Sequence, residues 1–291
     1  DIGRVSPIFY TKRTVTSGRS RNTARSRSLG TLRRKVWESM KVLVTFAVEN
    51  EFAPWRRLRG FRRAAAAEPS LFEARIGSAE VCVVLTGIGP QHARRALQIA
   101  LANGANICVA TGLAGALQSR HRIGDVLVAQ TVRAASGGSF VKSDAELLHA
   151  AAACGAREVN AFQSSDHAVL TAKDKGRLAF SADAVEMEGF TILSEAHGLH
   201  VPAVAIRAIG DMASQDLPLD FNRTVGPKGQ ISIPRVFGQL VRNPHRLPGL
   251  VRLGRDTHMA ATRLAKFLDR YVDILAAARR PEGVHEEVAV G

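Results

Sequence analysis

Short apolar runs of strand length alternate with helical patterns through most of the chain, from Met40 onward. Runs rich in β-branched residues predict strands at 41–48, 71–77, 80–86, 106–111, 125–133, 158–163, 182–186 and 201–208. Apolar residues at helical spacing predict helices at 91–103, 144–154, 173–180 and 188–197. Such alternation is typical of a sheet covered on both faces by helices. The sequence therefore predicts the α/β class.

The positive charge is concentrated near the start of the chain. The formal net charge is +14, and residues 1–39 contain ten Lys and Arg against Asp1 and Glu38, which leaves +6 for the rest. This mildly basic body predicts no specific nucleic-acid partner. Residues 1–39 show no helical or strand period, so they are expected to be a disordered basic tail, as are residues 281–291 at the other end.

Three origins of the 1–39 segment remain open: a targeting peptide, a nucleic-acid-binding tail, or translated sequence upstream of the working protein. The last is favoured, because Met40 directly precedes the first predicted strand. No apolar run approaches the roughly 18 residues needed to cross a bilayer, and no secretory signal opens the chain. A cytoplasmic location is expected. The three widely separated cysteines offer no CxxC spacing, and no metal site is predicted.

Residues 214–255 interrupt the alternation within an expected domain at 40–280. The stretch contains five prolines and seven Lys and Arg against Asp216 and Asp220. We expect it to be an insertion, either a basic lid or oligomer contact, or a peripheral membrane contact. Beyond it, apolar residues at three- and four-residue steps predict a long helix at 256–279 that packs on the sheet.

Two glycine turns follow predicted strands. Thr86 and Gly87 open the first, and Gly112 lies in the second. Backbone N–H groups at such turns suit an anion or a polarised hydroxyl, although a tight turn alone also requires glycine.

Carboxylates stand at the ends of three predicted strands. Glu186 and Glu188 come just before a helix, where interaction with the helix dipole is the alternative explanation. Asp211 follows the apolar strand that contains Arg207, and the two form either a structural ion pair or part of a site with perturbed pKa values. Glu51 lies just past the first strand.

Together these motifs resemble the nucleoside phosphorylase and nucleosidase superfamily in order and spacing, over residues 40 to 213. They are Thr86-Gly87-Ile88-Gly89, Thr111-Gly112-Leu113-Ala114-Gly115, Ile123-Gly124-Asp125, Val185-Glu186-Met187-Glu188 and Arg207-Ala208-Ile209-Gly210-Asp211. The resemblance implies a three-layer α/β/α fold with a mixed central sheet. The 214–255 stretch and the long final helix are similar to those of the hopanoid-associated phosphorylases.

The resemblance also implies roles for the site residues. Asp211 would be the general acid at purine N7, Glu188 would hold the ribose hydroxyls, and Met187 would lie against the sugar. Glu51 would activate water, as in the methylthioadenosine and adenosylhomocysteine nucleosidases. The other members of the expected substrate site are Thr86, which would help hold the nucleophile, and Gly87, Gly112, Glu186 and Arg207.

The expected activity is cleavage of the N-glycosidic bond of a purine nucleoside or 5′-substituted adenosine, without cofactor or metal. Ala110 occupies the position where related phosphorylases place a phosphate-binding Arg, so water is favoured over phosphate as the nucleophile. Phosphorolysis, with phosphate as co-substrate and an adenosylated hopanoid among the substrates, is the alternative. A non-catalytic nucleoside-binding or lipid-binding protein is a further one. A homodimer or larger homo-oligomer is expected, as in relatives.

Overall fold

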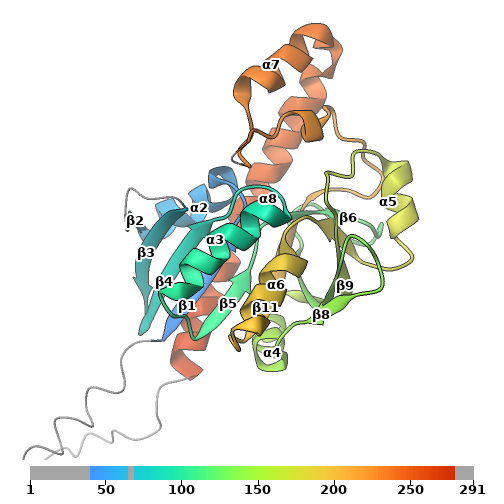
Figure 1. Cartoon of the computed structure of the whole chain (residues 1–291). Coiled ribbons are helices and arrows are strands. Elements are labelled where there is room, and N and C mark those ends of the chain that lie inside the picture. The colour runs from blue at the N-terminus through green and yellow to red at the C-terminus, as the bar shows by residue number, and fades with distance from the viewer. Residues whose placement is uncertain (1–39, 65–68, 228, 279–291) are drawn as a thin grey trace, which may run out of the picture. The chain divides into compact units, whose positions relative to one another are not determined.

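The computed structural model describes residues 40–64, 69–227 and 229–278, and it has the predicted three-layer α/β/α fold with a mixed central sheet. Within these residues the sheet has eleven strands in the order β2-β3-β4-β1-β5-β11-β6-β10-β9-β7-β8 (Figure 1). The strands are β1 Lys41–Phe46, β2 Arg62–Arg63, β3 Ser70–Ile76, β4 Ala79–Leu85, β5 Ile107–Ala110, β6 Leu113–Ala116, β7 Val126–Arg133, β8 Phe140–Lys142, β9 Arg157–Ser164, β10 Ala184–Glu186 and β11 Ala203–Asp211.

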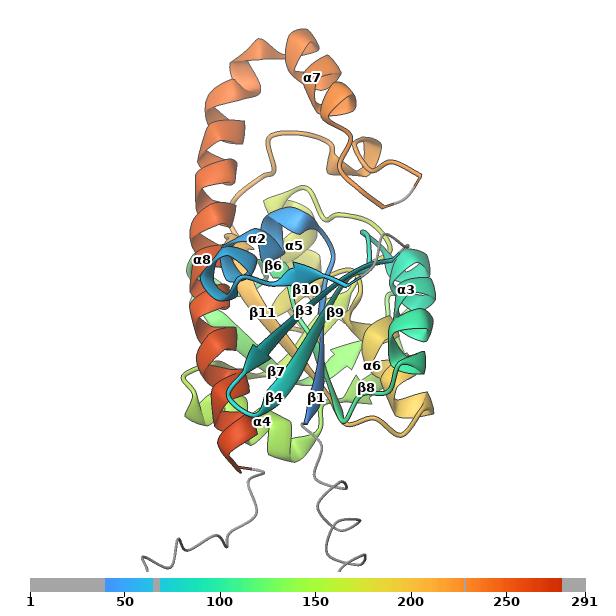
Figure 2. The same ribbon diagram turned by 90° about the vertical axis from the view of Figure 1, so that its left-hand side faces the viewer.

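Helices cover both faces of this sheet. They are α2 Glu49–Arg59, α3 Pro90–Ala102, α4 Ala145–Ala153, α5 Ala172–Leu178, α6 Gly189–Gly198, α7 Ile233–Arg242 and α8 Leu247–Ala278, with 3-10 turns at Phe221–Arg223 and Pro244–Arg246. Helices α2, α4 and α8 share one apolar core with the sheet, while α3 and α6 share the other (Figure 2). Aliphatic residues dominate both cores, which the low aromatic content requires.

Strand β11 lies in the middle of the sheet, with Arg207 at its centre and Asp211 as its last residue. It pairs in parallel with β5 and β6 and antiparallel with β7. The register shifts between Ile209 and Asp211, opposite β6. Parallel strands β1, β5 and β11 all end at the same edge of the sheet, so the segments that follow them lie together there.

The chain directly after β1 forms a helix that the sequence analysis did not predict. Helix α2 carries Glu49 and Glu51 in its first turn and arginines in its last turn, as the helix dipole favours. Gly60 ends it in the left-handed conformation, where its N–H donates to the Arg56 carbonyl (2.8 Å). Because Glu51 belongs to this first turn, α2 fixes its position. The short strands β6 and β8 were also not predicted.

The predicted start of the final helix near Asp256 is wrong, because α8 already begins at Leu247, within the 214–255 stretch. Pro248 stands in its first turn, where the missing N–H has no helical partner in any case. Helix α7 precedes it, and together they extend past the layers of the sheet (Figures 1 and 2). No helix among the described residues is long and apolar enough to cross a membrane. The tails predicted at 1–39 and 281–291 lie outside the described residues.

Candidate active site

Carboxyl groups from α2, β10, the start of α6 and the end of β11 line one cavity of about 600 Å³ at the carboxyl edge of the sheet. They are Glu51, Glu186, Glu188 and Asp211. Met187 lines the same cavity. The fold thus brings together five of the nine predicted site residues. A cavity of this size suits a small organic ligand.

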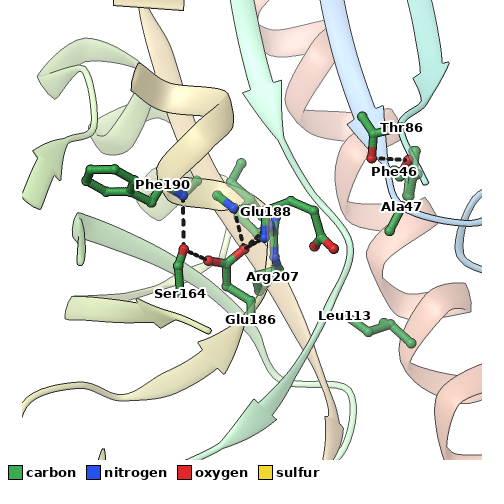
Figure 3. Close-up of polar contacts among 12 residues, drawn as sticks. Phe46, Ala47, Thr86, Leu113, Ser164, Glu186, Glu188, Phe190 and Arg207 are labelled. Carbon is green, nitrogen blue, oxygen red and sulfur yellow. Dashed lines mark hydrogen bonds and ion pairs between the residues drawn. The ribbon is translucent and has the colours of Figure 1, made fainter. Parts of the chain in front are cut away.

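Glu186 and Arg207 form a buried ion pair that supports the cavity floor. The guanidinium donates to Glu186 Oε2 (2.6 Å), and both side chains are 1% exposed (Figure 3). The same oxygen accepts the backbone N–H groups of Glu188 (3.0 Å) and Gly189 (2.6 Å), while Ser164 Oγ contacts Oε1. Every member of this cluster has a partner, so Glu186 holds the chain at Glu188 in a fixed position. The alternative of an Arg207–Asp211 ion pair is wrong, since Arg207 contacts Glu186.

Glu188 is a buried carboxyl group that faces the first glycine turn. Its Oε1 accepts the N–H of Gly89 (2.7 Å), which joins this turn to the start of α6. Burial, reinforced by the neighbouring negative charge of Glu186, raises the pKa of Glu188 to about 8. The group is therefore largely protonated at neutral pH in the absence of ligand.

Glu51 is oriented by two backbone donors. Its Oε2 accepts the N–H of Ala47 and its Oε1 that of Leu113, each at 3.1 Å. Burial raises the pKa of Glu51, and the hydrogen bond from Leu113 and the charge of Arg207 offset part of that effect. Gly112 has a φ of +143° and lies so close that a Cβ there would be 3.1 Å from Glu51 Oε2. Gly112 therefore makes room for Glu51 rather than lining the cavity.

Asp211 pairs with a buried lysine that sequence reasoning missed. The Lys175 ammonium, on α5, contacts the Asp211 carboxylate and donates to the carbonyls of Met212 (2.8 Å) and Gln215 (2.9 Å). Its side chain is 1% exposed, whereas that of Asp211 is 16% exposed and lines the cavity. Burial raises the pKa of Asp211, and Lys175 offsets part of the rise.

The first glycine turn contributes Ile88 to the cavity but not Thr86 or Gly87. Thr86 and Gly87 line a second, adjoining cavity that shares Ala47, Val48 and Asn50 with the first. The Thr86 hydroxyl donates to the carbonyl of Gly87 (2.9 Å), in its own turn. It also lies 3.3 Å from the carbonyl of Phe46 (Figure 3). The structure thus does not place Thr86 among the carboxyl groups.

The insertion supplies an apolar outer wall that the sequence analysis did not predict. Its cavity-lining side chains are Leu217, Phe221, Ile231, Leu250 and Leu253. Among the described residues, no group of three His, Cys, Asp or Glu side chains is arranged to hold a metal ion.

Comparison with known proteins identifies the family. Residues 41–237 match the family model described as the phosphorylase superfamily. The chain belongs to the phosphorylase superfamily. This confirms the resemblance predicted from the motifs at the level of the superfamily, while the narrower resemblance to hopanoid-associated phosphorylases stays a prediction.

Within the phosphorylase superfamily, the chain is similar to several nucleosidases. It is 24% identical to the aminodeoxyfutalosine nucleosidase of Campylobacter jejuni over 218 residues, which are 66% of this chain and 95% of that protein. Its fold matches the 5′-methylthioadenosine/S-adenosyl homocysteine nucleosidase of C. jejuni with a TM-score of 0.64 and 19% identity, over 81% of this chain and 100% of the other. The futalosine hydrolase of Helicobacter pylori matches with a TM-score of 0.64 and 21% identity, over 81% and 98%.

Glu188→Gln is expected to make the stability of the folded chain less sensitive to pH. The folded-state pKa of about 8 lies above the ordinary 4.5, so this proton stabilises the fold fully below pH 4.5 and is lost as the pH rises through 8. The wild-type melting temperature should therefore fall more than that of the variant between pH 6 and 9. We expect a difference of at least about 2–4 °C, which corresponds to roughly 1 kcal/mol for a chain of this size.

The measurement is thermal unfolding across that pH range. Glu73→Gln, on an exposed position of β3, is the matched control and should follow the wild type. Equal pH dependence in wild type and Glu188→Gln would contradict the raised pKa.

Proposed function

We propose that this phosphorylase superfamily member hydrolyses the N-glycosidic bond of a purine nucleoside or 5′-substituted adenosine. The observation that carries the proposal is the convergence of Glu51, Glu188 and Asp211 on one cavity, from three segments far apart in the sequence. The nucleosidases among its relatives support the same reaction class.

Cleavage of this bond needs a proton for the departing base and oxygen ligands for a sugar that develops positive charge. Asp211 is the proposed general acid at purine N7, because its carboxyl group lines the cavity and burial makes it easier to protonate than an ordinary aspartate. Glu188 would bind the ribose hydroxyls. Met187 would lie against the sugar, and the Glu186–Arg207 pair would hold Glu188 in place.

Water is the proposed nucleophile, activated by Glu51. The two backbone donors leave the Glu51 carboxylate fixed at the cavity wall, as a general base requires. Ala110, where a phosphate-binding Arg would be expected, is fully buried at the end of β5. These features favour hydrolysis over phosphorolysis.

The apolar outer wall supports an apolar 5′ substituent on the substrate. Phe221, Leu250 and Leu253 line the cavity with apolar side chains. They offer a surface for an alkylthio or larger hydrophobic group. The same wall would contact the hydrophobic part of an adenosylated hopanoid.

The test is product analysis with the full chain and a panel of substrates, each with and without phosphate. The panel contains adenosine, methylthioadenosine, adenosylhomocysteine, aminodeoxyfutalosine and an adenosylated hopanoid. We expect release of free base and free sugar from at least one of them, at a rate that phosphate leaves unchanged. A sugar 1-phosphate product would establish phosphorolysis instead. No base release from any substrate would favour the non-catalytic binding protein.

A further inference from the structure

The hairpin formed by α7 and the first turns of α8 exposes large apolar side chains, although it belongs to the folded domain. On α7, Ile233, Phe237 and Val241 follow one another at four-residue steps and are 73%, 64% and 64% exposed. Leu247 and Val251 are exposed at the same spacing at the start of α8. Side chains four apart lie on one face of a helix, so each helix presents an apolar stripe to its surroundings. Exposed apolar stripes of this kind mark an interaction surface.

The charged residues in and just before the hairpin are all positive. Residues 221–255 contain seven Lys and Arg and no Asp or Glu. Among them, Arg242, Arg246, Arg252 and Arg255 are exposed around the turn of the hairpin. A partner for this surface must therefore combine negative charge with an apolar interior.

Hydrogen bonds join the hairpin to the rest of the insertion and, at its base, to the body of the domain. The Gln239 amide group makes two hydrogen bonds with the backbone of Asp220, at 2.9 and 3.0 Å. At its base, the Gly229 carbonyl accepts the N–H of Ile88 in the first glycine turn (2.8 Å). Residues of the segment also line the cavity, Ile231 and Leu250 among them. A surface that binds the hairpin would therefore lie close to the cavity.

We propose that the α7–α8 hairpin docks on an anionic lipid surface, with the apolar stripes inserted among the headgroups and the arginines against the phosphates. Bilayers of this kind provide both the negative charge and the apolar interior that the surface requires. A symmetric contact with a second copy would instead bring the five arginines of residues 233–255 against the same five. Binding to single-stranded nucleic acid favours several aromatic side chains for base stacking, whereas Phe237 is the one aromatic residue in α7.

The test is sedimentation of the full chain with vesicles of phosphatidylglycerol and phosphatidylcholine, at about 0.15 M salt. The arginine triple consists of Arg242→Ser, Arg246→Ser and Arg252→Ser. Its control, with the same change of charge, consists of Arg62→Ser, Arg122→Ser and Arg133→Ser, all exposed elsewhere on the domain. We expect the hairpin triple to bind about 100-fold more weakly, which corresponds to about 1 kcal/mol for each arginine. The control triple should bind within about threefold of the wild type, because its arginines lie outside the hairpin.

The apolar stripe is tested by Phe237→Ser with Val241→Ser, which should weaken vesicle binding at least about tenfold. The matched pair is Phe140→Ser with Leu199→Ser, on β8 and after α6, where side chains of similar exposure should not affect binding. Pure phosphatidylcholine vesicles should bind weakly.

Three results would overturn the proposal: no binding to anionic vesicles, equal loss in the hairpin and control variants, or a change of oligomeric state in place of a change in vesicle binding. The last result, seen by sedimentation velocity, would make the hairpin a subunit contact. Because the readout is vesicle binding, it does not depend on the proposed hydrolase activity.

Discussion

Asp211→Asn is expected to lower kcat by at least about 100-fold on the nucleoside that the chain cleaves. The amide keeps the shape of the side chain but has no acidic proton to transfer to the departing purine, and loss of a general acid costs about 10²–10⁴-fold. Glycosidic cleavage depends strongly on that proton, since an unprotonated purine is a poor leaving group. The measurement is steady-state kcat, with KM determined in parallel.

The buried ammonium of Lys175 complicates this substitution. Asp211→Asn removes the carboxylate that balances the charge of Lys175, which is 1% exposed, so the variant should also lose stability. The double variant, Asp211→Asn with Lys175→Met, lacks the ammonium as well, and we expect its melting temperature to recover by several degrees. The value of kcat should stay low in the double variant. Recovery of kcat would show that the single variant lost activity because of the unbalanced charge of Lys175, and not because it lacked a general acid.

Asp125→Asn is the matched control. Asp125 accepts the N–H of Arg122 (3.0 Å) in a turn outside the cavity lining, so its loss should change kcat by less than about twofold. A value of kcat for Asp211→Asn within tenfold of the wild type would exclude Asp211 as the general acid.

The carboxyl groups of the site could be predicted from the sequence because each follows a strand. Glu51 and Asp211 stand just beyond or at the ends of β1 and β11, and parallel strands that end at one edge bring such residues together. The same reasoning could not predict Lys175. Its helix, Ala172–Leu178, has four charged residues among its seven, as an exposed surface helix would, and only the packing of α5 against the end of β11 buries the ammonium.

The glycine turns show a second limit of sequence reasoning. Thr86 and Gly112 have the expected positions after strands, but which side of a turn faces a cavity depends on side chains from other segments. Gly112 lies against Glu51 because α2 follows β1 as a helix. That helix was not predicted, since the carboxylates after the first strand were interpreted only as site residues.

The insertion shows that prolines mark irregular backbone without showing where it ends. Its five prolines predict an interruption of the alternating pattern. However, Pro248 lies in the first turn of α8, where proline is compatible with a helix. The sequence pattern therefore could not fix the start of α8, nor predict that Leu250 and Leu253 line the cavity.

Glu51→Gln is expected to lower the rate of hydrolysis by at least about 100-fold, because an amide cannot take a proton from water. The structure adds a second cost. Both Glu51 oxygens accept backbone N–H groups, from Ala47 and Leu113, and the amide nitrogen of Gln cannot accept either bond. One buried donor loses its partner, which costs about 1–3 kcal/mol of stability, so the melting temperature must be measured beside kcat.

The kinetics of this variant also separate the two nucleophiles. Phosphate needs no base to make it nucleophilic, whereas water does, so phosphorolysis would survive Glu51→Gln and hydrolysis would not. In the wild type, the raised pKa of Glu51 should place the acid limb of the rate profile above the ordinary carboxyl range, because the base is inactive while protonated. Glu49→Gln is the control. Glu49 lies two residues before Glu51 in α2, and its carboxylate pairs with Arg56 (2.7 Å), so this variant should keep kcat within about twofold. A Glu51→Gln variant that releases base at the wild-type rate only when phosphate is present would replace hydrolysis by phosphorolysis as the reaction of this chain.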